Sequence, residues 1–524
     1  MKVVSVEQMI AIEQSANSAG LSYETMMQNA GKGIADWVYK NLDTTQGVIG
    51  LVGSGNNGGD TIIALTHLAK LGIRTSVFLV KTRERDRLLE TYQAYGGAII
   101  NVSDKNNFDI LEASVIPGVI VMDGVLGTGL KLPLRGVLHE VMATLHQQLK
   151  TRSDVRKIAI DCPSGVDCDT GEVSDVTIRA DHTLTMAAMK QGLLRHPARS
   201  FAGELHFIGI GIEDLSDHIM DELPNLIDRE HIGALLPSRP DEGHKGTFGT
   251  CMVIAGSEPY IGAAFLTGKA AYRAGCGLVH MVSHREVHRS LAGRLIEAVW
   301  TVIPDIKGAY DPDGVNLVTK ALQDADAVVV GPGWGLGDDN SAFLKNLLTQ
   351  IPRKTPILID ADGLKMLSKI KNWWNLLPEQ TVLAPHPGEM AVLTGLDIED
   401  IQADRWKIAD KFANLWKVNL ILKGAMTINA SPDADVYINP VSDSALGTAG
   451  SGDVLSGVIG GLMSQGVSAH AASILGVWLH SQAGTIAANN YLSSFSVLAT
   501  DILHGLPLAF FKAKEAGNRP ASSG

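Results

Sequence analysis

Two glycine-rich loops of different design constrain the fold of this chain more than any other feature. The first reads Gly-Ser-Gly-Asn-Asn-Gly-Gly-Asp at residues 53–60, and the second reads Gly-Thr-Ala-Gly-Ser-Gly-Asp at residues 447–453. Each lies between a run of apolar or small residues and a pattern typical of a helix, and each ends in an aspartate. Exposed peptide N–H groups at a helix N-terminus bind anions readily. The sequence therefore predicts two sites for phosphate-bearing ligands on two domains.

Length and composition predict a globular enzyme with more than one core. A chain of 524 residues is too long for a single core, and 45% hydrophobic with 19% charged residues argue against disorder. A net charge of −12 without a block of basic residues argues against a nucleic-acid partner. The four cysteines form no CxxC pair, so no disulfide framework is expected. No apolar run reaches membrane-spanning length and no signal-peptide pattern is present, so we expect a cytoplasmic protein.

Residues 1–220 alternate strand and helix patterns. Ser22 is a candidate N-cap for a helix over 23–41, and a strand over 48–52 leads into the first glycine loop. Further predicted helices cover residues 61–71, 84–95 and 134–149, and further predicted strands cover residues 76–80, 98–102, 119–122, 157–160 and 205–210. Because βαβ units build parallel sheets that helices cover on both faces, we expect a Rossmann-like α/β/α sandwich.

A second α/β series fills residues 226–515. The segment 214–230 is acidic, contains a proline and lacks a clean period, so it is the predicted domain boundary. Predicted strands cover residues 250–255, 278–282, 327–330, 357–359, 381–384 and 420–422, and predicted helices cover residues 263–274, 453–465 and 469–489. The pattern predicts a second α/β domain.

The first loop is distinguished by two adjacent asparagines, Asn56 and Asn57. Asparagine tolerates left-handed backbone geometry and offers both an amide donor and a carbonyl acceptor. Such a loop could bind a phosphate through backbone N–H groups and a cation through an amide oxygen. The alternative is a tight strand-to-helix turn with no ligand.

Three aspartates, Asp60, Asp123 and Asp161, follow apolar strands in glycine-bearing loops. The carboxyl ends of parallel strands meet at one edge of the sheet, where open α/β folds bind ligands. A single aspartate in this position is more often a helix cap or a turn former. Three of them favour convergence on one site.

The second loop ends in Asp453, at the predicted start of a helix. The N–H groups of residues 450–453 would form an anion site, strengthened by the helix dipole. Asp453 would project into the same pocket and could abstract or relay a proton. The alternative is a helix that is simply capped by Ser451.

Other apparent strand ends carry supporting residues. Lys423 follows the predicted strand 420–422 and is placed to contact a nucleotide phosphate. His386 lies between two prolines, and the segment 331–335 is rich in glycine, which lets a ligand approach the backbone. Asp360 could touch a metal or cap a turn, and both interpretations stay open.

These motifs together resemble known families. Gly-Ser-Gly-Asp at 450–453 with Lys-Gly at 423–424 resembles the ribokinase-like fold, whose members bind a nucleotide across the sheet edge. The motifs His-Lys-Gly, Gly-Pro-Gly and His-Pro-Gly-Glu narrow this resemblance to the NAD(P)H-hydrate dehydratases; they stand at residues 244–246, 331–333 and 386–389.

The N-terminal motifs resemble NAD(P)H-hydrate epimerase. They are Asn-Asn-Gly-Gly-Asp at 56–60, Asp123 with Gly-Thr-Gly at 127–129, and Pro-Ser-Gly-Val-Asp at 163–167. The order of the two halves is similar to that of the fused bifunctional repair enzymes of bacteria and archaea, and the resemblance covers nearly the whole chain. Thr61 departs from the epimerase pattern, which usually continues with glycine. We expect Thr61 to tighten the exit of the loop without removing its chemistry.

The resemblance implies two coupled activities. Residues 1–220 would interconvert the R and S hydrates of NADH or NADPH, and residues 226–515 would dehydrate the S form with hydrolysis of ADP. Phosphorylating the C6 hydroxyl would turn a poor leaving group into a good one. The implied ligands are K⁺, ADP and Mg²⁺, and we expect a homo-oligomer.

The resemblance also implies a set of site residues. In the first half, the hydrate would contact Asn56, Asn57, Gly58, Gly59, Asp60, Gly127, Thr128, Gly129, Leu130, Lys131, Leu132, Pro133 and Asp161. The potassium ion would be held by Asn57, Asp123 and Ser164. In the second half, the adenine nucleotide would contact Lys423, Gly424, Ala425, Met426, Thr427 and Gly452, and the hydrate would face Ala263, Gly333, His386 and Asp453. Asp453 and Asp161 are the expected catalytic residues.

Two other functions stay open from the sequence. The ribokinase-like core alone would also suit an ATP-dependent kinase of a vitamin precursor. The N-terminal half could be a regulatory module that only binds a nucleotide, although a pure binder need not keep Asp60, Asp123 and Asp161. Product analysis separates the first alternative from repair, and an epimerase assay separates the second.

Overall fold

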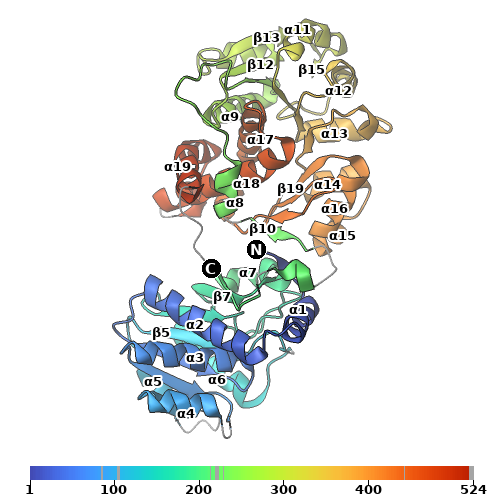
Figure 1. The fold of residues 1–524 in the computed structure, drawn as a ribbon. Coiled ribbons are helices and arrows are strands. Elements are labelled where there is room, and N and C mark those ends of the chain that lie inside the picture. Colours follow the sequence, from blue (N-terminus) through green and yellow to red (C-terminus); the bar gives the residue numbers. More distant parts are fainter. Residues whose placement is uncertain are drawn as a thin grey trace. The chain divides into compact units, whose positions relative to one another are not determined.

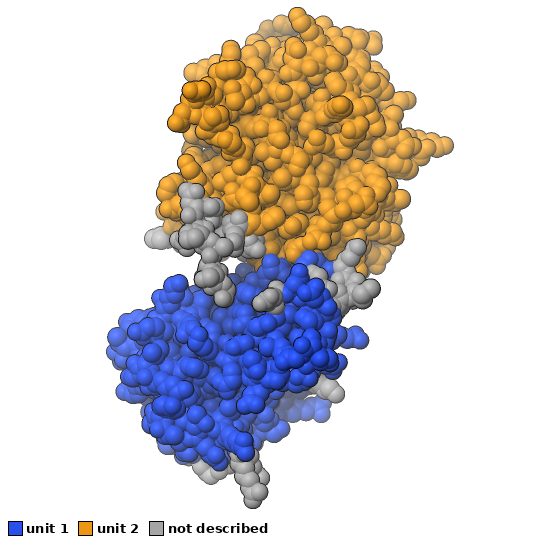
Figure 2. All heavy atoms as spheres, viewed as in Figure 1, with its two compact units in different colours: residues 1–223, 524 blue, residues 224–523 orange. Residues whose placement is uncertain are grey.

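The chain folds into two compact units. The computed structural model describes residues 1–83, 86–102, 107–130, 132–212, 214–218, 223–227, 229–441, 443–491 and 493–517. Contacts divide the chain into unit 1, Met1–Leu223, and unit 2, Pro224–Ser523 (Figure 2). This division falls within the acidic segment 214–230. Each unit has its own sheet and its own hydrophobic core.

Within the described residues, unit 1 contains a seven-stranded parallel sheet. Its strands are β2 (Val48–Val52), β3 (Thr75–Leu79), β4 (Ala98–Asn101), β5 (Ile120–Gly124), β6 (Arg156–Ile160), β7 (His182–Met186) and β9 (Glu204–Ile208). The order across the sheet is β4-β3-β2-β5-β6-β7-β9. The chain therefore starts in the middle, builds to one side, and then returns to build the other, as in a Rossmann fold. The topological switch point, where such folds bind ligands, lies between β2 and β5.

Helices cover both faces of this sheet (Figure 1). They are α1 (Val6–Ser18), α2 (Tyr23–Asn41), α3 (Asn56–Lys70), α4 (Arg87–Ala94), α5 (Phe108–Ser114), α6 (Gly136–Leu149) and the short α7 (Arg199–Ala202). Side chains of β2 point alternately to the two faces of the sheet and so belong to two hydrophobic cores. Val48 and Val52 pack with α1–α4, whereas Ile49 and Leu51 pack with α5 and α6. This alternation is expected for a strand buried on both faces. The predicted α/β/α sandwich is confirmed.

Local sequence signals set several boundaries of unit 1. The Ser22 side chain accepts a hydrogen bond from the Thr25 N–H, and α2 spans the predicted residues. Two predictions were wrong. The helix after the first glycine loop begins at Asn56 rather than at residue 61, because glycines 58 and 59 pack as its first turn. Strand β7 was not predicted, since its threonines are buried among apolar residues and hide the alternation. Residues 84 and 85 of a predicted helix lie outside the described residues.

Within the described residues, unit 2 contains a ten-stranded sheet. Its strands are β10 (Asn225–Leu226), β11 (Thr250–Ile254), β12 (Leu278–His284), β13 (Val299–Ile303), β16 (Ala327–Val330), β17 (Ile357–Ile359), β18 (Thr381–Leu383), β19 (Asn419–Leu422), β20 (Ile428–Ala430) and β21 (Tyr437–Ile438). Their order is β10-β21-β20-β19-β18-β17-β16-β11-β12-β13. The run from β19 to β13 is parallel, and β20 and β21 turn antiparallel at one side.

Four long helices pack on one face of the unit 2 sheet and form its largest core: α9 (Ile261–Arg273), α17 (Ser451–Met463), α18 (Ala469–Asn490) and α19 (Ala499–Gly517). The other helices are α8 (Arg229–Leu235), α10 (Arg285–Leu291), α11 (Thr319–Gln323), α12 (Asp338–Gln350), α13 (Asp362–Ser368), α14 (Pro387–Thr394), α15 (Ile398–Ala403) and α16 (Arg405–Trp416). Helix α17 begins two residues before its predicted start, so Asp453 lies inside its first turn. No helix in the described part of the chain is long and apolar enough to cross a membrane.

Candidate active sites

A cavity of about 950 Å³ opens at the switch point of the unit 1 sheet. Its lining comes from the first glycine loop, the ends of β3 and β5, and the start of α6: Gly53, Ser54, Gly55, Asn56, Asn57, Val80, Lys81, Thr82, Val125, Leu126, Gly127, Thr128, Gly129, Leu130, Arg135, Val137 and Leu138. The predicted Asn56, Asn57 and residues 127–130 are therefore brought together. Lys81 and Arg135 add basic groups that suit a phosphate-bearing ligand.

The first glycine loop is held in place by close backbone contacts. A Cβ atom at Gly53 would overlap the Val125 carbonyl, so only glycine fits between the two loops. Arg83 donates hydrogen bonds to the carbonyl oxygens of Gly53 (2.8 Å) and Gly55 (3.1 Å), and it pairs with Asp86 at 2.5 Å. The loop is thus pre-organised beside the cavity, by an arginine that the sequence alone did not single out.

Asn57, Asp123 and Ser164 lie together behind this loop. The Ser164 hydroxyl donates to the Asp123 carboxylate at 2.5 Å, and the Ser164 N–H donates to it at 2.9 Å. The Asn57 amide donates to the carbonyl oxygens of Leu126 (3.0 Å) and Ile160 (2.6 Å). Burial raises the pKa of Asp123, and hydrogen bonds from Ser164 oppose this rise. Carboxylate, amide, hydroxyl and carbonyl oxygens around a buried acid fit a hard monovalent or divalent cation.

Three buried ionisable side chains, Asp60, Asp161 and Lys190, and the half-buried Glu13 form a group near this cluster. Asp161 has a left-handed backbone (φ 64°) and accepts hydrogen bonds from the Met186 N–H (3.1 Å) and from Lys190, which is 1% exposed. Burial, Asp161 and Glu13 raise the pKa of Asp60 well above its usual range, and Lys190 opposes this rise. Asp60 and Asp161 therefore interact, and the structure adds Glu13 and Lys190 to the group. A lone lysine after the apolar run at residues 186–189 was the signal that could have revealed Lys190.

The remaining predicted hydrate contacts lie around the cavity rather than on its wall. Gly58, Gly59 and Asp60 form the buried first turn of α3. Leu132 and Pro133 line a neighbouring hollow of about 420 Å³ with Gly129 and Leu130. Thr61 is fully buried, and its hydroxyl donates to the Asn57 carbonyl at 2.7 Å, so this departure from the family pattern adds a bond within the first turns of α3. Lys131 lies outside the described residues.

The second candidate site forms where α17 begins. Gly450 is the N-cap residue with φ 88°, and the Ser451 side chain donates to the Leu446 carbonyl instead of capping the helix. The alternative of a simple serine cap is therefore wrong. Burial and Asp360 raise the pKa of Asp453 to about 7, against the opposing effect of Lys423. A carboxyl group that titrates near neutral pH is suited to proton transfer.

A lysine and two carboxylates face this helix end. Lys423 pairs with Asp360 at 2.6 Å and lies 3.7 Å from Glu389. The Ser456 hydroxyl of α17 donates to the other Asp360 oxygen at 2.6 Å. Burial lowers the pKa of Lys423, but Asp360 and Glu389 outweigh this effect and raise it. A Cβ atom at Gly452 would lie 3.7 Å from the lysine nitrogen, so glycine keeps the space open between the helix end and the lysine.

The predicted nucleotide loop, residues 423–427, is shaped by a half-buried arginine that the sequence did not reveal. Arg405 donates to the carbonyl oxygens of Leu422 (3.1 Å) and Lys423 (3.1 Å) and also to that of Ala425. Gly424 has φ 143° and Met426 has φ 59°, so the turn bends sharply after β19. The Thr427 hydroxyl closes it by donating to the Gly424 carbonyl at 3.0 Å.

The predicted hydrate contacts of unit 2 fall into two groups. His386 caps α14: its Nδ1 accepts hydrogen bonds from the N–H groups of Gly388 (3.0 Å) and Glu389 (3.3 Å), which leaves Nε2 for a proton. Burial and then Lys423 lower the pKa of His386. Gly333 lies against Ala263, because a Cβ atom at Gly333 would come within 2.7 Å of the alanine methyl group. Gly333 and Ala263 thus adjoin, and their contact with the hydrate stays a prediction.

Fold and sites together define a two-part α/β enzyme, with a Rossmann-like unit followed by a ribokinase-like unit. A model of YjeF-related protein N-termini matches residues 23–192, and a model of NAD(P)H-hydrate dehydratase matches residues 251–508. The bifunctional NAD(P)H-hydrate repair enzyme of Moorella thermoacetica is 32% identical over 98% of each chain. That of Thermofilum pendens is 32% identical over 93% of this chain and 92% of its own. The chain belongs to the family of bifunctional NAD(P)H-hydrate repair enzymes.

Solved structures were also similar to one part of the chain. The ADP/ATP-dependent NAD(P)H-hydrate dehydratase of Bacillus subtilis, co-crystallised with ATP and Mg²⁺, is 28% identical. It covers 56% of this chain and 100% of its own, with a TM-score of 0.48. The full-length family assignment confirms the predicted resemblance and favours repair over a vitamin-precursor kinase.

Proposed function

We propose that this protein repairs hydrated nicotinamide cofactors with one activity in each unit. Unit 1 interconverts the R and S hydrates of NADH and NADPH, and unit 2 dehydrates the S form at the expense of ADP. The observation that carries the proposal is the match to a bifunctional repair enzyme over 98% of both chains. In each unit, a carboxyl group whose pKa is raised by desolvation lies beside a phosphate-compatible loop, which supports the proposal.

For epimerisation, the cavity at the switch point would hold the hydrate with its phosphates near the first glycine loop and Lys81. Epimerisation requires reversible loss and return of water at C6, so a proton must be given and taken back. Burial and the nearby Asp161 carboxylate raise the pKa of Asp60, which favours its protonated form. We assign the proton relay to Asp161, which Lys190 orients.

A potassium ion fits the oxygen cluster of Asn57, Asp123 and Ser164. The ion would supply the positive charge that the buried Asp123 carboxylate requires. Replacing K⁺ by Li⁺ in the assay, together with the Asp123→Asn variant, tests this assignment. Epimerisation that is indifferent to both changes contradicts it.

For dehydration, residues 423–427 and Gly452 would hold the adenine nucleotide, and His386, Gly333 and Ala263 would face the hydrate. Asp453 takes the proton from the C6 hydroxyl, whose oxygen then attacks the terminal phosphoryl group of ADP. AMP leaves, and loss of phosphate from C6 with a proton from C5 restores the ring double bond. The N–H groups of residues 450–453 and Lys423 stabilise the charge on the phosphoryl group. Mg²⁺ would neutralise the nucleotide phosphates, with Asp360 the nearest carboxylate to Lys423.

The test is an assay of the purified full chain with R and S hydrates and with ADP or ATP. We expect R hydrate to be converted to S without nucleotide, and S hydrate to regain the absorbance of reduced nicotinamide only when nucleotide is present. A stable phosphorylated product with no restored absorbance would instead indicate a small-molecule kinase. If R hydrate is not converted to S hydrate, unit 1 is instead a module that only binds a nucleotide.

A further inference from the structure

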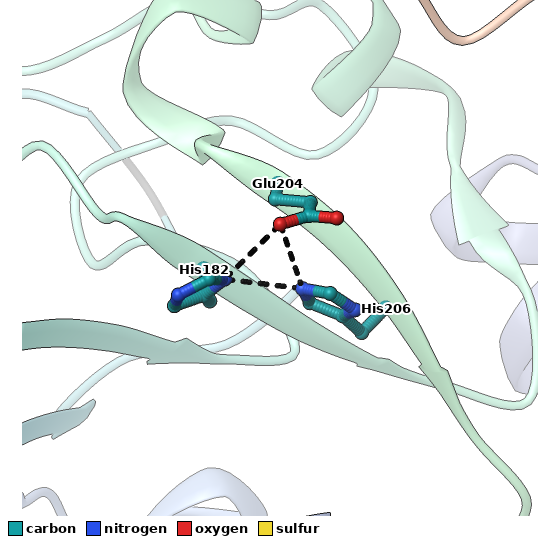
Figure 3. Close-up of side chains that lie close together, drawn as sticks. All are labelled: His182, Glu204 and His206. Carbon is teal, nitrogen blue, oxygen red and sulfur yellow. Dashed lines mark hydrogen bonds and ion pairs between the residues drawn. The ribbon is translucent and has the colours of Figure 1, made fainter. Parts of the chain in front are cut away.

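Three side chains with metal-binding atoms lie close together on β7 and β9, away from the candidate active site of unit 1. Nδ1 of His182 lies 3.1 Å from Nε2 of His206, and one carboxylate oxygen of Glu204 lies 3.7 Å from the first nitrogen and 3.8 Å from the second (Figure 3). One ligand atom from each residue thus falls within 4.8 Å of the other two. Two imidazoles and a carboxylate that face one another form a compact set of electron-pair donors.

Strand pairing fixes this arrangement. His182 is directly opposite Glu204 in the parallel ladder, and His206 follows Glu204 by two residues. Because side chains alternate along a strand, all three project from the same face of the sheet. Their spacing is therefore set by the backbone hydrogen bonds of two strands rather than by a loop, which limits the reorganisation required for binding.

A tryptophan supports the two imidazoles from the neighbouring helix. The Trp37 ring, on α2, lies 5.2 Å from the His182 ring and 4.5 Å from the His206 ring. The two histidine side chains are only 20% and 21% exposed, whereas the Glu204 side chain is 64% exposed. The rings are thus held by packing, and the exposed Glu204 carboxylate is free of such packing and can adjust its position toward them.

The spacing also suits a transition-metal site. Zinc binds imidazole nitrogen and carboxylate oxygen at about 2.0–2.2 Å, so ligand atoms of a tetrahedral site lie about 3.4 Å apart. The observed separations of 3.1, 3.7 and 3.8 Å bracket that distance. Imidazole nitrogen favours Zn²⁺, Ni²⁺ or Cu²⁺ over Mg²⁺ or Ca²⁺, which prefer oxygen.

We propose that His182, Glu204 and His206 bind a divalent transition-metal ion, Zn²⁺ by preference, that ties the edge strand β9 to β7. His182 and Glu204 are the first residues of their strands, so the site lies at the amino ends of the parallel sheet. Asp123 and Asp161 lie at the opposite, carboxyl ends. The metal therefore stabilises the edge strand β9, whose outer side pairs with no other strand among the described residues, and it takes no part in epimerisation.

The test is equilibrium dialysis of the metal-stripped full chain against Zn²⁺, with metal analysis of the protein. We expect His206→Ala and Glu204→Gln to weaken Zn²⁺ binding by about 100-fold or more, because even outer-shell changes cost about 10- to 100-fold. Zn²⁺ should also raise the thermal unfolding temperature of the unchanged protein but not that of His206→Ala. The matched control is His139→Ala, which removes a histidine 3.7 Å from Asp175 elsewhere in unit 1 and should bind Zn²⁺ normally.

Trp37 provides a second readout that does not depend on stability. It is the single tryptophan of residues 1–223, and it contacts both imidazoles. Bound Cu²⁺ should quench a component of the fluorescence that is missing in Trp37→Phe, and this quenching should disappear in His206→Ala. Equal Zn²⁺ uptake by the unchanged protein and by folded His206→Ala, or Cu²⁺ quenching that is unaltered in His206→Ala, would overturn the proposal.

Discussion

At the scale of single residues, burial sets the chemistry of both candidate sites. Asp60 in unit 1 and Asp453 in unit 2 both have a raised pKa, and desolvation is the largest cause for each. A nearby lysine partly opposes the rise in each case: the buried Lys190 for Asp60 and the half-buried Lys423 for Asp453. In a low-dielectric pocket, the interaction of such a carboxyl group and lysine with a bound substrate is stronger than it would be in water.

The first prediction concerns the base proposed for dehydration. Asp453→Asn keeps the size of the side chain but cannot accept the hydroxyl proton, so we expect dehydration to fall by about 100-fold or more. Adenine-nucleotide affinity should change little, because the loop at residues 423–427 is untouched. Recovery of reduced-nicotinamide absorbance and nucleotide titration measure the two effects, and near-normal dehydration would contradict the assignment.

The second prediction follows from the pKa of about 7 for Asp453. The base form is the deprotonated one, so the dehydration rate should rise as pH increases through about 7 and level off above it. The pKa of Glu389 is also raised to about 7 by burial. A pH–rate profile of Glu389→Gln separates the two groups: the rise should persist in this variant. If the rise disappears there, Glu389 rather than Asp453 is the titrating group.

The third prediction concerns the buried pair of Lys190 and Asp161. Lys190→Met leaves an uncompensated carboxylate in the core, which typically costs about 3–5 kcal/mol of unfolding free energy. Adding Asp161→Asn to this variant should restore part of the loss. Lys32→Met is the matched control, since the Lys32–Asp36 pair is about two-thirds exposed and should contribute about 1 kcal/mol or less. Denaturant unfolding measures all three, and equal effects at Lys190 and Lys32 would refute the argument.

At the scale of secondary-structure elements, small residues decide how α17 reaches the second site. Gly457 lies where α17 crosses α9, and a Cβ atom there would overlap the Thr267 carbonyl. Gly460 and Gly461 make similar close approaches to the sheet and to α9. The helix that presents Asp453 therefore approaches α9 and the sheet closely through its glycines, while its large apolar side chains pack into the unit 2 core.

The fourth prediction tests this packing. Gly457→Ala should destabilise unit 2 by about 1–3 kcal/mol, because an added methyl group must push the two helices apart. Gly262→Ala is the control in α9, since no atom lies within 4 Å of its added Cβ and alanine favours a helix. Thermal unfolding of both variants checks the difference. Equal stability of the two variants would mean that the helix crossing has room to adjust.

At the scale of the whole molecule, the two units are separate packing entities with separate sites. The unit 2 core contains residues from 227 onward, and the unit 1 cores contain none beyond residue 223. The fifth prediction is that each activity survives loss of the other: Asp453→Asn should retain epimerisation, and Asp161→Asn should retain dehydration of pure S hydrate. Chromatographic separation of the hydrates and absorbance measure the two. Joint loss in either variant would indicate that the sites depend on each other.

The sequence by itself determined the class of each unit and most of the site motifs. The signals are local: the periods of strands and helices, the N-cap at Ser22 and the two glycine loops. Such signals depend on neighbouring residues in the sequence and not on distant partners in the fold. The same holds for the placement of Asp123 and Asp161 at strand ends, which the βαβ rhythm already implies.

Only the tertiary structure decided which distant residues share a site. Lys190 and Glu13 join Asp60 and Asp161, Arg405 shapes the loop at residues 423–427, and His182 meets Glu204 and His206 across two strands. These groupings depend on strand order and register, which arise from packing over long sequence separations. The pKa of Asp453 likewise depends on how deeply the folded chain buries it and how near Asp360 lies, and neither burial nor distance is encoded in a local pattern.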